Sequence, residues 1–409
     1  MRKSSLLVVT IAVTGALTLS ACGSRGAKSG TDSAAGGTKV VIGVDAPLTG
    51  KLSALGLGIK NSVDLAVNKA NKDKTVPGVT FAIEAMDDQA NPTSGQQNAT
   101  ALVGKSEVAG VVGPLNSSVS LTMQKVFNDA HLAQVSPANT NPQLSLGPDW
   151  GSSKFVRPYA SYFRTATTDV VQGKFAAQYL YSEAKKTKVY VIDDKKTYGA
   201  GLAAIFQEEF KKLGGTVVGA DHINPDDKDF SAVATKVASS GADSVYYGGE
   251  YPEGGPLSDQ IKKAGAKVPL FGGDGLYDDE FIKLSNNNSN GDLATSVGAP
   301  VEELDSAKTF ISDYKAAGYK DPYAAYGGYS FDAAWSIIEA VKKAVADNGG
   351  KVPTDLRAKV IDSLSKVSFD GVTGKVSFDQ YGDTTNKQLT VYTVKDNKWV
   401  PVKSGTYTG

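Results

Sequence analysis

The stretch KVYVIDDKKTYGAGLAAIFQEEFKKLGGTVVGADHI, residues 188–223, decides the fold. An apolar run of strand type leads into a polar turn, then into apolar residues at helical spacing, a double-glycine stop and a second apolar run. Residues 39–71, KVVIGVDAPLTGKLSALGLGIKNSVDLAVNKAN, begin in the same order. Strands that alternate with helices of this length predict βαβ units and parallel sheets. Two such series predict two similar lobes.

The remainder of the chain continues both series. In the second series, LSDQIKKAGA at residues 257–266 predicts a helix between two short apolar strands. Residues 322–347 return to helical spacing, and residues 369–383, FDGVTGKVSFDQYGD, form a β stretch interrupted by glycines. The sequence therefore predicts an α/β protein throughout its length.

The composition limits the class of function. The chain has 409 residues, which is enough for two ordinary domains, and its 43 basic and 43 acidic residues give a formal net charge of zero. Binding to nucleic acid requires a basic field that meets the phosphates. No nucleic-acid partner is therefore expected.

The N-terminus predicts export. Arg2 and Lys3 precede an apolar stretch over residues 6–19, and LSAC ends at Cys22, which resembles the lipobox of bacterial lipoproteins. We predict a signal peptide over residues 1–21 and a lipid on Cys22; the alternative is a stray cysteine near an ordinary cleavage site. Cys22 is the only cysteine, so no intramolecular disulfide can form. Residues 22–38 are rich in small residues and predict a flexible tether.

Reactive groups are scarce, which argues against an enzyme. His131 and His222 are the only histidines, and neither HExxH nor CxxC occurs. Residues 101–106, ALVGKS, end like a phosphate-binding loop, but Ala99 stands where that motif needs its first glycine. We expect no enzymatic activity, no metal and no cofactor.

Polar residues follow the predicted strands of the first series. Ser117 and Ser118 stand where a strand meets a helix, and hydroxyl groups beside the free N–H groups of a helix start bind a carboxylate well. Asn139 and Thr140 follow the next strand. Each pair is a candidate for holding an anion, and the alternative for each is a simple helix cap.

Hydroxyl and acidic residues follow the strands of the second series. Tyr198 lies in the turn of KKTYGAG, Glu250 in GGEYPEGG and Asp274 in FGGDGLYD. The carboxyl ends of parallel strands are where α/β proteins bind ligands. Helix ends in one lobe and carboxylates in the other suit a zwitterion, while a solvated strand end is the alternative for Glu250.

These motifs together resemble a known family. The lipobox, the tether and the segments VVGPLNSSVS, SPANTNP, TYGAG, YYGGEYPEGG and FDGVTGKVSFDQYGD follow the order found in the branched-chain amino-acid-binding proteins of ABC transporters, the leucine/isoleucine/valine-binding family. These are type I periplasmic binding proteins. The resemblance implies two Rossmann-like α/β lobes with parallel sheets, joined by three crossover strands.

The resemblance also implies lobe boundaries and residue roles. Lobe 1 would comprise residues 39–166 and 299–374, and lobe 2 residues 167–298 and 375–409. By the resemblance, Ser117 hydrogen-bonds the ligand carboxylate, Thr140 helps hold its head group, Tyr198 reaches across from lobe 2, and Asp274 takes the ammonium.

The chain departs from the family at two places. Leu55 stands near where some members place an aromatic lid residue, and Glu250 stands where a tyrosine is common. If the register slips by one residue, Tyr251 lines the cleft instead of Glu250. Two carboxylates beside one ligand ammonium do not identify the ligand, because the second acid suits additional positive charge or additional hydrogen-bond donors. The candidates are a branched-chain or polar amino acid, a basic amino acid, an amide, a urea-like compound and a polyamine.

The sequence thus predicts an extracytoplasmic solute-binding protein that delivers an amino acid or related compound to an ABC permease. We expect a monomer held by Cys22 at the outer face of the cytoplasmic membrane. Two alternatives are a ligand-sensing domain of the same fold that works with a separate signalling protein and, less favoured, an extracellular hydrolase.

Overall fold

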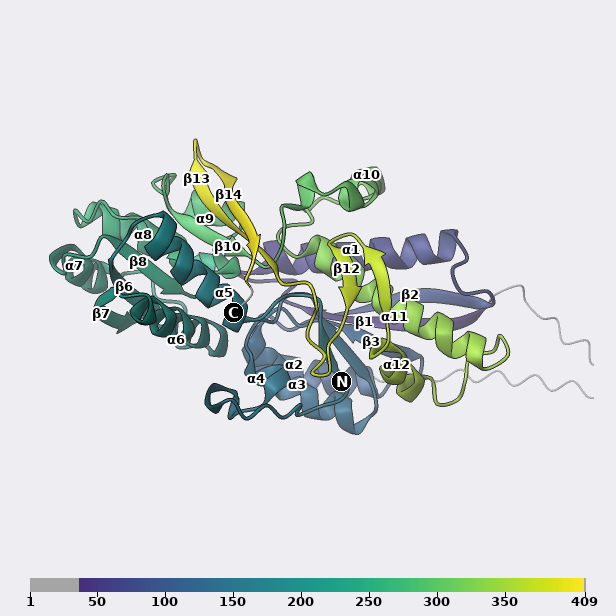
Figure 1. Ribbon diagram of the computed structural model, residues 1–409. Helices are drawn as coiled ribbons and strands as arrows, with labels where there is room; N and C mark the ends of the chain where they lie inside the picture. Colours follow the sequence, from purple (N-terminus) through teal and green to yellow (C-terminus); the bar gives the residue numbers. More distant parts are fainter. Residues whose placement is uncertain (1–36, 408–409) are drawn as a thin grey trace, which may run out of the picture. The chain divides into compact units, whose positions relative to one another are not determined.

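Two large β-sheets organise the computed structural model, which describes residues 37–407. The predicted signal peptide, Cys22 and most of the predicted tether lie outside these residues. The first sheet has five parallel strands in the order β2-β1-β3-β4-β5 (Figure 1). Its strands are β1 (Thr38–Ala46), β2 (Val79–Asp87), β3 (Val108–Val112), β4 (Ala133–Ser136) and β5 (Tyr162–Arg164).

Helices cover both faces of the first sheet. Along β1, Ile42 belongs to the apolar core shared with α1 and α11, whereas the next residue back, Val41, packs with α2 and α3 on the opposite face. Strands buried on both faces read as continuous apolar runs, which explains VAGVV in β3. The helices are α1 (Ser53–Lys72), α2 (Pro92–Val103), α3 (Ser117–Asp129), α10 (Lys308–Ala317), α11 (Gly327–Asp347) and α12 (Leu356–Leu364).

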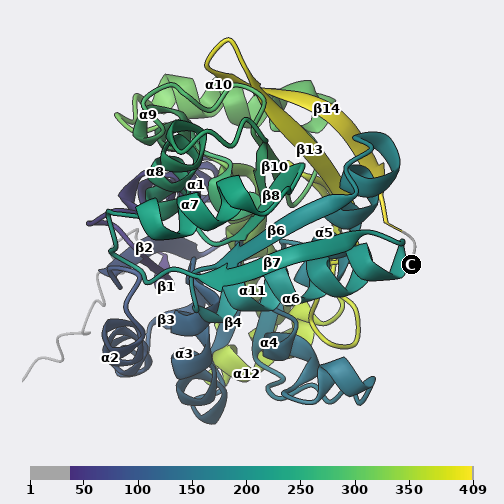
Figure 2. The same ribbon diagram turned by 90° about the vertical axis from the view of Figure 1, so that its left-hand side faces the viewer.

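The second sheet has seven strands in the order β14-β13-β10-β9-β8-β6-β7 (Figure 2). Five strands are parallel: β6 (Lys188–Asp193), β7 (Thr216–His222), β8 (Ser244–Gly248), β9 (Leu270–Gly272) and β10 (Leu293–Ser296). Its helices are α5 (Asp169–Gln178) with the π-helical turn η2 (Tyr179–Glu183), α6 (Thr197–Lys212), α7 (Ser231–Ser239), α8 (Tyr251–Lys263) and α9 (Asp279–Leu284).

An antiparallel hairpin closes one edge of the second sheet. β13 (Gln388–Lys395) pairs with β10, and β14 (Lys398–Thr406) pairs only with β13. Asp396 and Asn397 connect the two strands with φ angles of 52° and 57°. Asp and Asn tolerate this left-handed conformation, which two-residue hairpin turns require. The register shifts between Val391 and Tyr392, so Val402 of β14 forms a bulge.

The chain crosses between the two sheets three times, after β5, after β10 and before β13. The predicted α/β fold with two lobes and three crossovers is confirmed, while the residue limits of the lobes stay a prediction. A small hairpin, β11 (Ser368–Gly371) with β12 (Gly374–Ser377), precedes the third crossover. The short helices are α4 (Gln143–Leu146), η1 (Trp150–Ser152), η3 (Asp274–Leu276), η4 (Val301–Glu303) and η5 (Asp305–Ala307).

One helix begins earlier than predicted. α8 starts at Tyr251, six residues before the predicted start at Leu257, with Glu250 at its N-cap. Pro252 lies in the first turn, where its missing N–H group has no intrahelical partner to lose. Pro256 lies inside the helix and removes one backbone hydrogen bond. The two prolines concealed this first turn from a pattern-based prediction.

Candidate functional site

A small cavity lies where the carboxyl ends of strands from both sheets meet. Its volume is about 20 Å³, which is about the space of one water molecule. An amino acid is therefore admitted only when the lobes or the lining side chains move apart. The lining residues come from both lobes: Leu55, Leu115, Asn116, Ser117, Ala138, Tyr198, Glu250, Asp274, Gly275 and Tyr326.

The structure brings five of the nine predicted site residues to this cavity: Leu55, Ser117, Tyr198, Glu250 and Asp274. Ser118, Asn139, Thr140 and Tyr251 are not among its lining residues. The sequence left open whether Glu250 or its neighbour Tyr251 lines the cleft, and in the structure Glu250 lines the cavity. Their roles toward a ligand stay predictions.

The four residues outside the lining have other surroundings. Asn139 donates through Nδ2 to the carbonyl oxygens of Pro114 and Leu115, at 3.2 and 2.8 Å, and so braces the loop before α3. Tyr251 donates its hydroxyl to the carbonyl oxygen of Lys51 at 2.6 Å. Ser118 is half-buried, and Thr140 is buried.

The first-lobe wall of the cavity is the start of α3. Ser117 is the first helical residue, and the side chain of the N-cap residue Asn116 makes no capping hydrogen bond. The first N–H groups of a helix have no intrahelical acceptor and carry the positive end of the helix dipole. With the Ser117 hydroxyl beside them, these groups can hold a carboxylate.

Asp274 faces this wall from the second lobe. Its Oδ1 accepts from Tyr198 at 2.8 Å and from Gln172 at 2.9 Å, and its Oδ2 accepts from Tyr326 at 2.7 Å. Burial raises the pKa of Asp274, and the three donors oppose that rise. Within residues 37–407 no cationic side chain forms an ion pair with this carboxylate, so a positive charge is the one partner it lacks.

A second buried acid lies behind Asp274. The side-chain amide of Gln172 donates to Asp169 at 3.2 Å as well as to Asp274. Burial and the negative charge of Asp274 raise the pKa of Asp169 to about 8. At neutral pH Asp169 is therefore largely uncharged, and Asp274 is the member of the pair available to meet a cation.

Glu250, unlike Asp274, has a cationic partner. Its Oε2 lies 2.8 Å from Nζ of Lys196, and its Oε1 accepts from the side-chain amide of Asn116 across the cleft. Burial lowers the pKa of Lys196, but the carboxylates of Glu250 and Asp194 outweigh it and raise that pKa above its ordinary value. Glu250 and Asp274 thus differ, because Glu250 has a lysine as its ion-pair partner and Asp274 has none in the described residues.

Other contacts also join the two lobes. Lys51 Nζ lies 2.7 Å from Asp226 and 3.0 Å from the buried Glu253, so an ion-pair cluster spans from the loop after β1 to α8. Asn141 donates to the carbonyl oxygen of Thr197 at 2.8 Å. These contacts hold the lobes together at the cavity.

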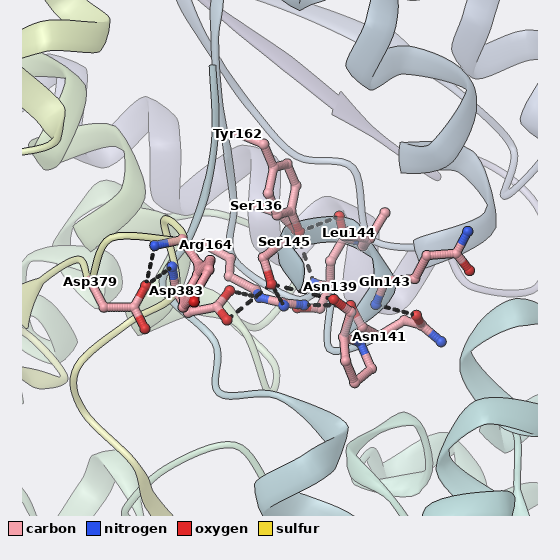
Figure 3. A network of polar contacts seen from close by, with 12 residues as sticks. Ser136, Asn139, Asn141, Gln143, Leu144, Ser145, Tyr162, Arg164, Asp379 and Asp383 are labelled. Carbon is pink, nitrogen blue, oxygen red and sulfur yellow. Dashed lines mark hydrogen bonds and ion pairs between the residues drawn. The ribbon is translucent and has the colours of Figure 1, made fainter. Parts of the chain in front are cut away.

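A buried arginine supports the first-lobe wall from behind (Figure 3). Arg164, at the end of β5, is fully buried, and its Nε lies 2.6 Å from Asp383 in the third crossover. Its guanidinium also donates to the carbonyl oxygens of Asn139 and Asn141, at 3.2 and 2.9 Å, and to Ser145. Arg164 thereby ties the loop after β4 to a crossover.

A larger hollow of about 550 Å³ lies elsewhere on the second lobe. Two of its three lysines, Lys262 and Lys263, are paired with Asp292 and Asp259, at 2.7 and 2.6 Å. It is an open surface feature, and no polar groups converge in it from two lobes. We therefore take the small interlobe cavity as the functional site.

Sequence reasoning missed several lining or supporting residues. Asn116 and Lys196 stand one and two residues from the predicted Ser117 and Tyr198, but their pairing with Glu250 joins separate segments and has no local signal. Tyr326 comes from the chain just before α11, far from any strand end. No pattern within its own segment marks it as a site residue.

Comparison with known proteins agrees with this architecture. The family model described as periplasmic binding protein matches residues 39–398, so the chain belongs to that family. It is a solute-binding protein of the class that works outside the cytoplasm. In the described residues, no helix has the length and apolar character needed to cross a membrane.

Three similar proteins carry names that refer to leucine, isoleucine or valine. The chain is 30% identical to the Leu/Ile/Val-binding protein BraC3 of Rhizobium johnstonii, over 86% of this chain and 91% of that protein. It is 31% identical to Leu/Ile/Val-binding protein homolog 3 of Brucella melitensis, over 88% and 93%. The crystal structure of the leucine binding protein LivK from Thermotoga maritima superposes with a TM-score of 0.77 at 25% identity, covering 89% and 98%.

Proposed function

We propose that the protein captures the zwitterion of an amino acid, or a similar amino or amide compound, between its lobes and delivers it to an ABC permease. The observation that carries this proposal is Asp274, a buried carboxylate without a cation, facing the open N-terminus of α3 at Ser117. The ligand ammonium binds Asp274 with Tyr198 and Tyr326, and the ligand carboxylate binds the first N–H groups of α3. The names of the Leu/Ile/Val-binding relatives support an amino acid.

The energetics suit a ligand of this kind. Each charge-assisted hydrogen bond contributes about 1.5–3 kcal/mol. Four or five such bonds, reduced by the entropy cost of ordering the ligand and the lobes, correspond to a binding free energy of about −8 kcal/mol, or micromolar affinity. Contacts to both lobes make the closed form the one that the ligand stabilises.

A thermal-shift screen tests the proposal. We expect L-amino acids that fit the cleft to raise the unfolding temperature of the purified protein, because a ligand at about 100 times its Kd stabilises by about 2.7 kcal/mol. Sugars and dicarboxylates without an amino group serve as controls. No shift with any amino acid, amide or polyamine would refute the proposal.

A sensing role is the second candidate, because a closed, ligand-bound form can be read by a signalling protein as well as by a permease. Reconstitution distinguishes the two roles: uptake of the ligand by a permease that depends on this protein supports transport. A hydrolase is the least favoured reading, and turnover of a bound compound by the purified protein would establish it.

We propose further that Cys22 carries a lipid that anchors the protein at the outer face of the cytoplasmic membrane, with the chain acting as a monomer. Replacing Cys22 by alanine is expected to move the protein from the membrane fraction to the soluble extracytoplasmic fraction, because a lipid is the anchor. Fractionation followed by immunoblotting measures this. Unchanged retention of Cys22→Ala in the membrane would contradict the anchor.

A further inference from the structure

One of the two carboxylates that line the cavity already has a cationic partner. Glu250 is buried, and Lys196 Nζ, 2.8 Å from its Oε2, neutralises it. Asp274 is the carboxylate left for the ligand ammonium, and Ser117 opens the helix that receives the ligand carboxylate. Glu250 and Asn116 then remain, with Leu55 and Leu115, to meet the side chain of the ligand.

Asn116 lines the cavity and carries an acceptor without a hydrogen-bond partner in the described part of the chain. Its Nδ2 faces Glu250, which fixes the amide orientation, because a carboxylate can only accept a hydrogen bond from the NH₂ group. Its Oδ1 is buried and has no hydrogen-bond partner among residues 37–407. A buried acceptor without a partner is unfavourable, so a ligand that supplies a donor there binds better than one that does not.

Charge excludes the ionised side chains. A cationic ligand side chain beside Glu250 would stand close to Lys196, which already fills the role of counter-ion. An anionic side chain would meet the carboxylates of Glu250 and Asp274. A purely apolar side chain would leave Asn116 Oδ1 unsatisfied. Only an uncharged side chain that donates hydrogen bonds suits all of these groups.

We propose that the solute is an amino acid whose side chain ends in an uncharged hydrogen-bond donor, a carboxamide or a hydroxyl, which meets Asn116 and Glu250. This inference rests on the proposed function, since it places the ligand's ammonium at Asp274. Leu55 and Leu115 contact the methylene part of the ligand side chain. Asparagine, glutamine, serine and threonine belong to the class, and leucine and valine do not.

Isosteric ligand pairs test the inference on the unmodified protein by calorimetry. Asparagine and leucine have the same shape, as do threonine and valine, but only the first of each pair donates hydrogen bonds from its side chain. We expect asparagine and threonine to bind about tenfold or more tightly than their partners. Asparagine is also expected to bind more tightly than aspartate and lysine.

Substitutions test which residues cause the preference for asparagine over leucine. Lys196→Met together with Glu250→Leu removes the close ion pair as a whole, so that neither member is left without the other; Asp194, 3.9 Å from Lys196 Nζ, loses its cationic neighbour. We expect the asparagine-to-leucine preference to fall by about tenfold. Lys195→Met is the matched control, because Lys195 is exposed and its Nζ donates to Asn224; its preference is expected to stay unchanged. The ligand comparison needs no variant, so it decides the matter even if the double variant does not fold.

The outcomes separate this inference from the proposed function. Tighter binding of leucine and valine would overturn the inference and leave amino-acid capture standing. A preference that survives the double substitution would remove Glu250 and Lys196 as its source. Absence of binding by every amino acid would refute both proposals together.

Discussion

Replacing Arg164 by methionine is expected to lower the free energy of unfolding by about 3–5 kcal/mol. The substitution leaves Asp383, 2.6 Å from Arg164 Nε, as a buried charge without its partner. It also leaves the carbonyl oxygens of Asn139 and Asn141 without that donor. Chemical denaturation of the unliganded protein measures the change.

A second arginine and a double substitution serve as controls. Arg157 donates to nearby backbone carbonyl oxygens, including that of Tyr162 at 2.7 Å, but forms no ion pair within 4 Å in the described part of the chain, so Arg157→Met should cost less. Adding Asp383→Asn to Arg164→Met should restore part of the loss, because it removes the unpaired charge. A loss below about 1 kcal/mol for Arg164→Met would show that the ion pair is not important for stability.

Replacing Asp274 by asparagine is expected to weaken amino-acid binding by about 10- to 150-fold. Of the two carboxylates that line the cavity, Asp274 is the one without an ion pair in the described part of the chain, so it is the one available to the ligand ammonium. The new amide would also direct its NH₂ group toward the hydroxyl of either Tyr198 or Tyr326, because these two donors bond different oxygens of Asp274. Calorimetry with the best ligand from the screen measures the loss.

Asp279→Asn is the matched control for Asp274→Asn, because Asp279 is an exposed carboxylate five residues later in the same lobe. Its affinity is expected to equal that of the unmodified protein. If Asp274→Asn binds as tightly as the control, the ammonium site lies elsewhere in the cleft.

The fold was largely predictable because its signals are local. In residues 188–223 the strand, turn, helix and strand each carry their own periodicity, and β6, α6 and β7 occupy the expected places. The position of the β13–β14 hairpin in the sheet has no such local signal. Its attachment to β10 is a pairing between strands about 90 residues apart, which no local pattern encodes.

Most positions of the cavity lining were predictable from the sequence, and the pairings between its side chains were not. Strand ends located Ser117, Tyr198, Glu250 and Asp274, because the carboxyl ends of parallel strands converge. That Glu250 pairs with Lys196 while Asp274 has no cation depends on side-chain directions in the folded chain. Glu250 is the N-cap residue of α8, and two prolines hid the early start of this helix at Tyr251.

The outer strand of the second sheet bears on solubility. Among the described strands, β14 has no neighbour beyond β13, and an open strand edge can recruit strands from other molecules. Pro401 lacks an N–H group, the bulge at Val402 breaks the regular spacing, and Lys398 and Lys403 are exposed on the strand. These features discourage edge-to-edge aggregation. They suit a protein that must stay dispersed where chaperones of the cytoplasm do not reach.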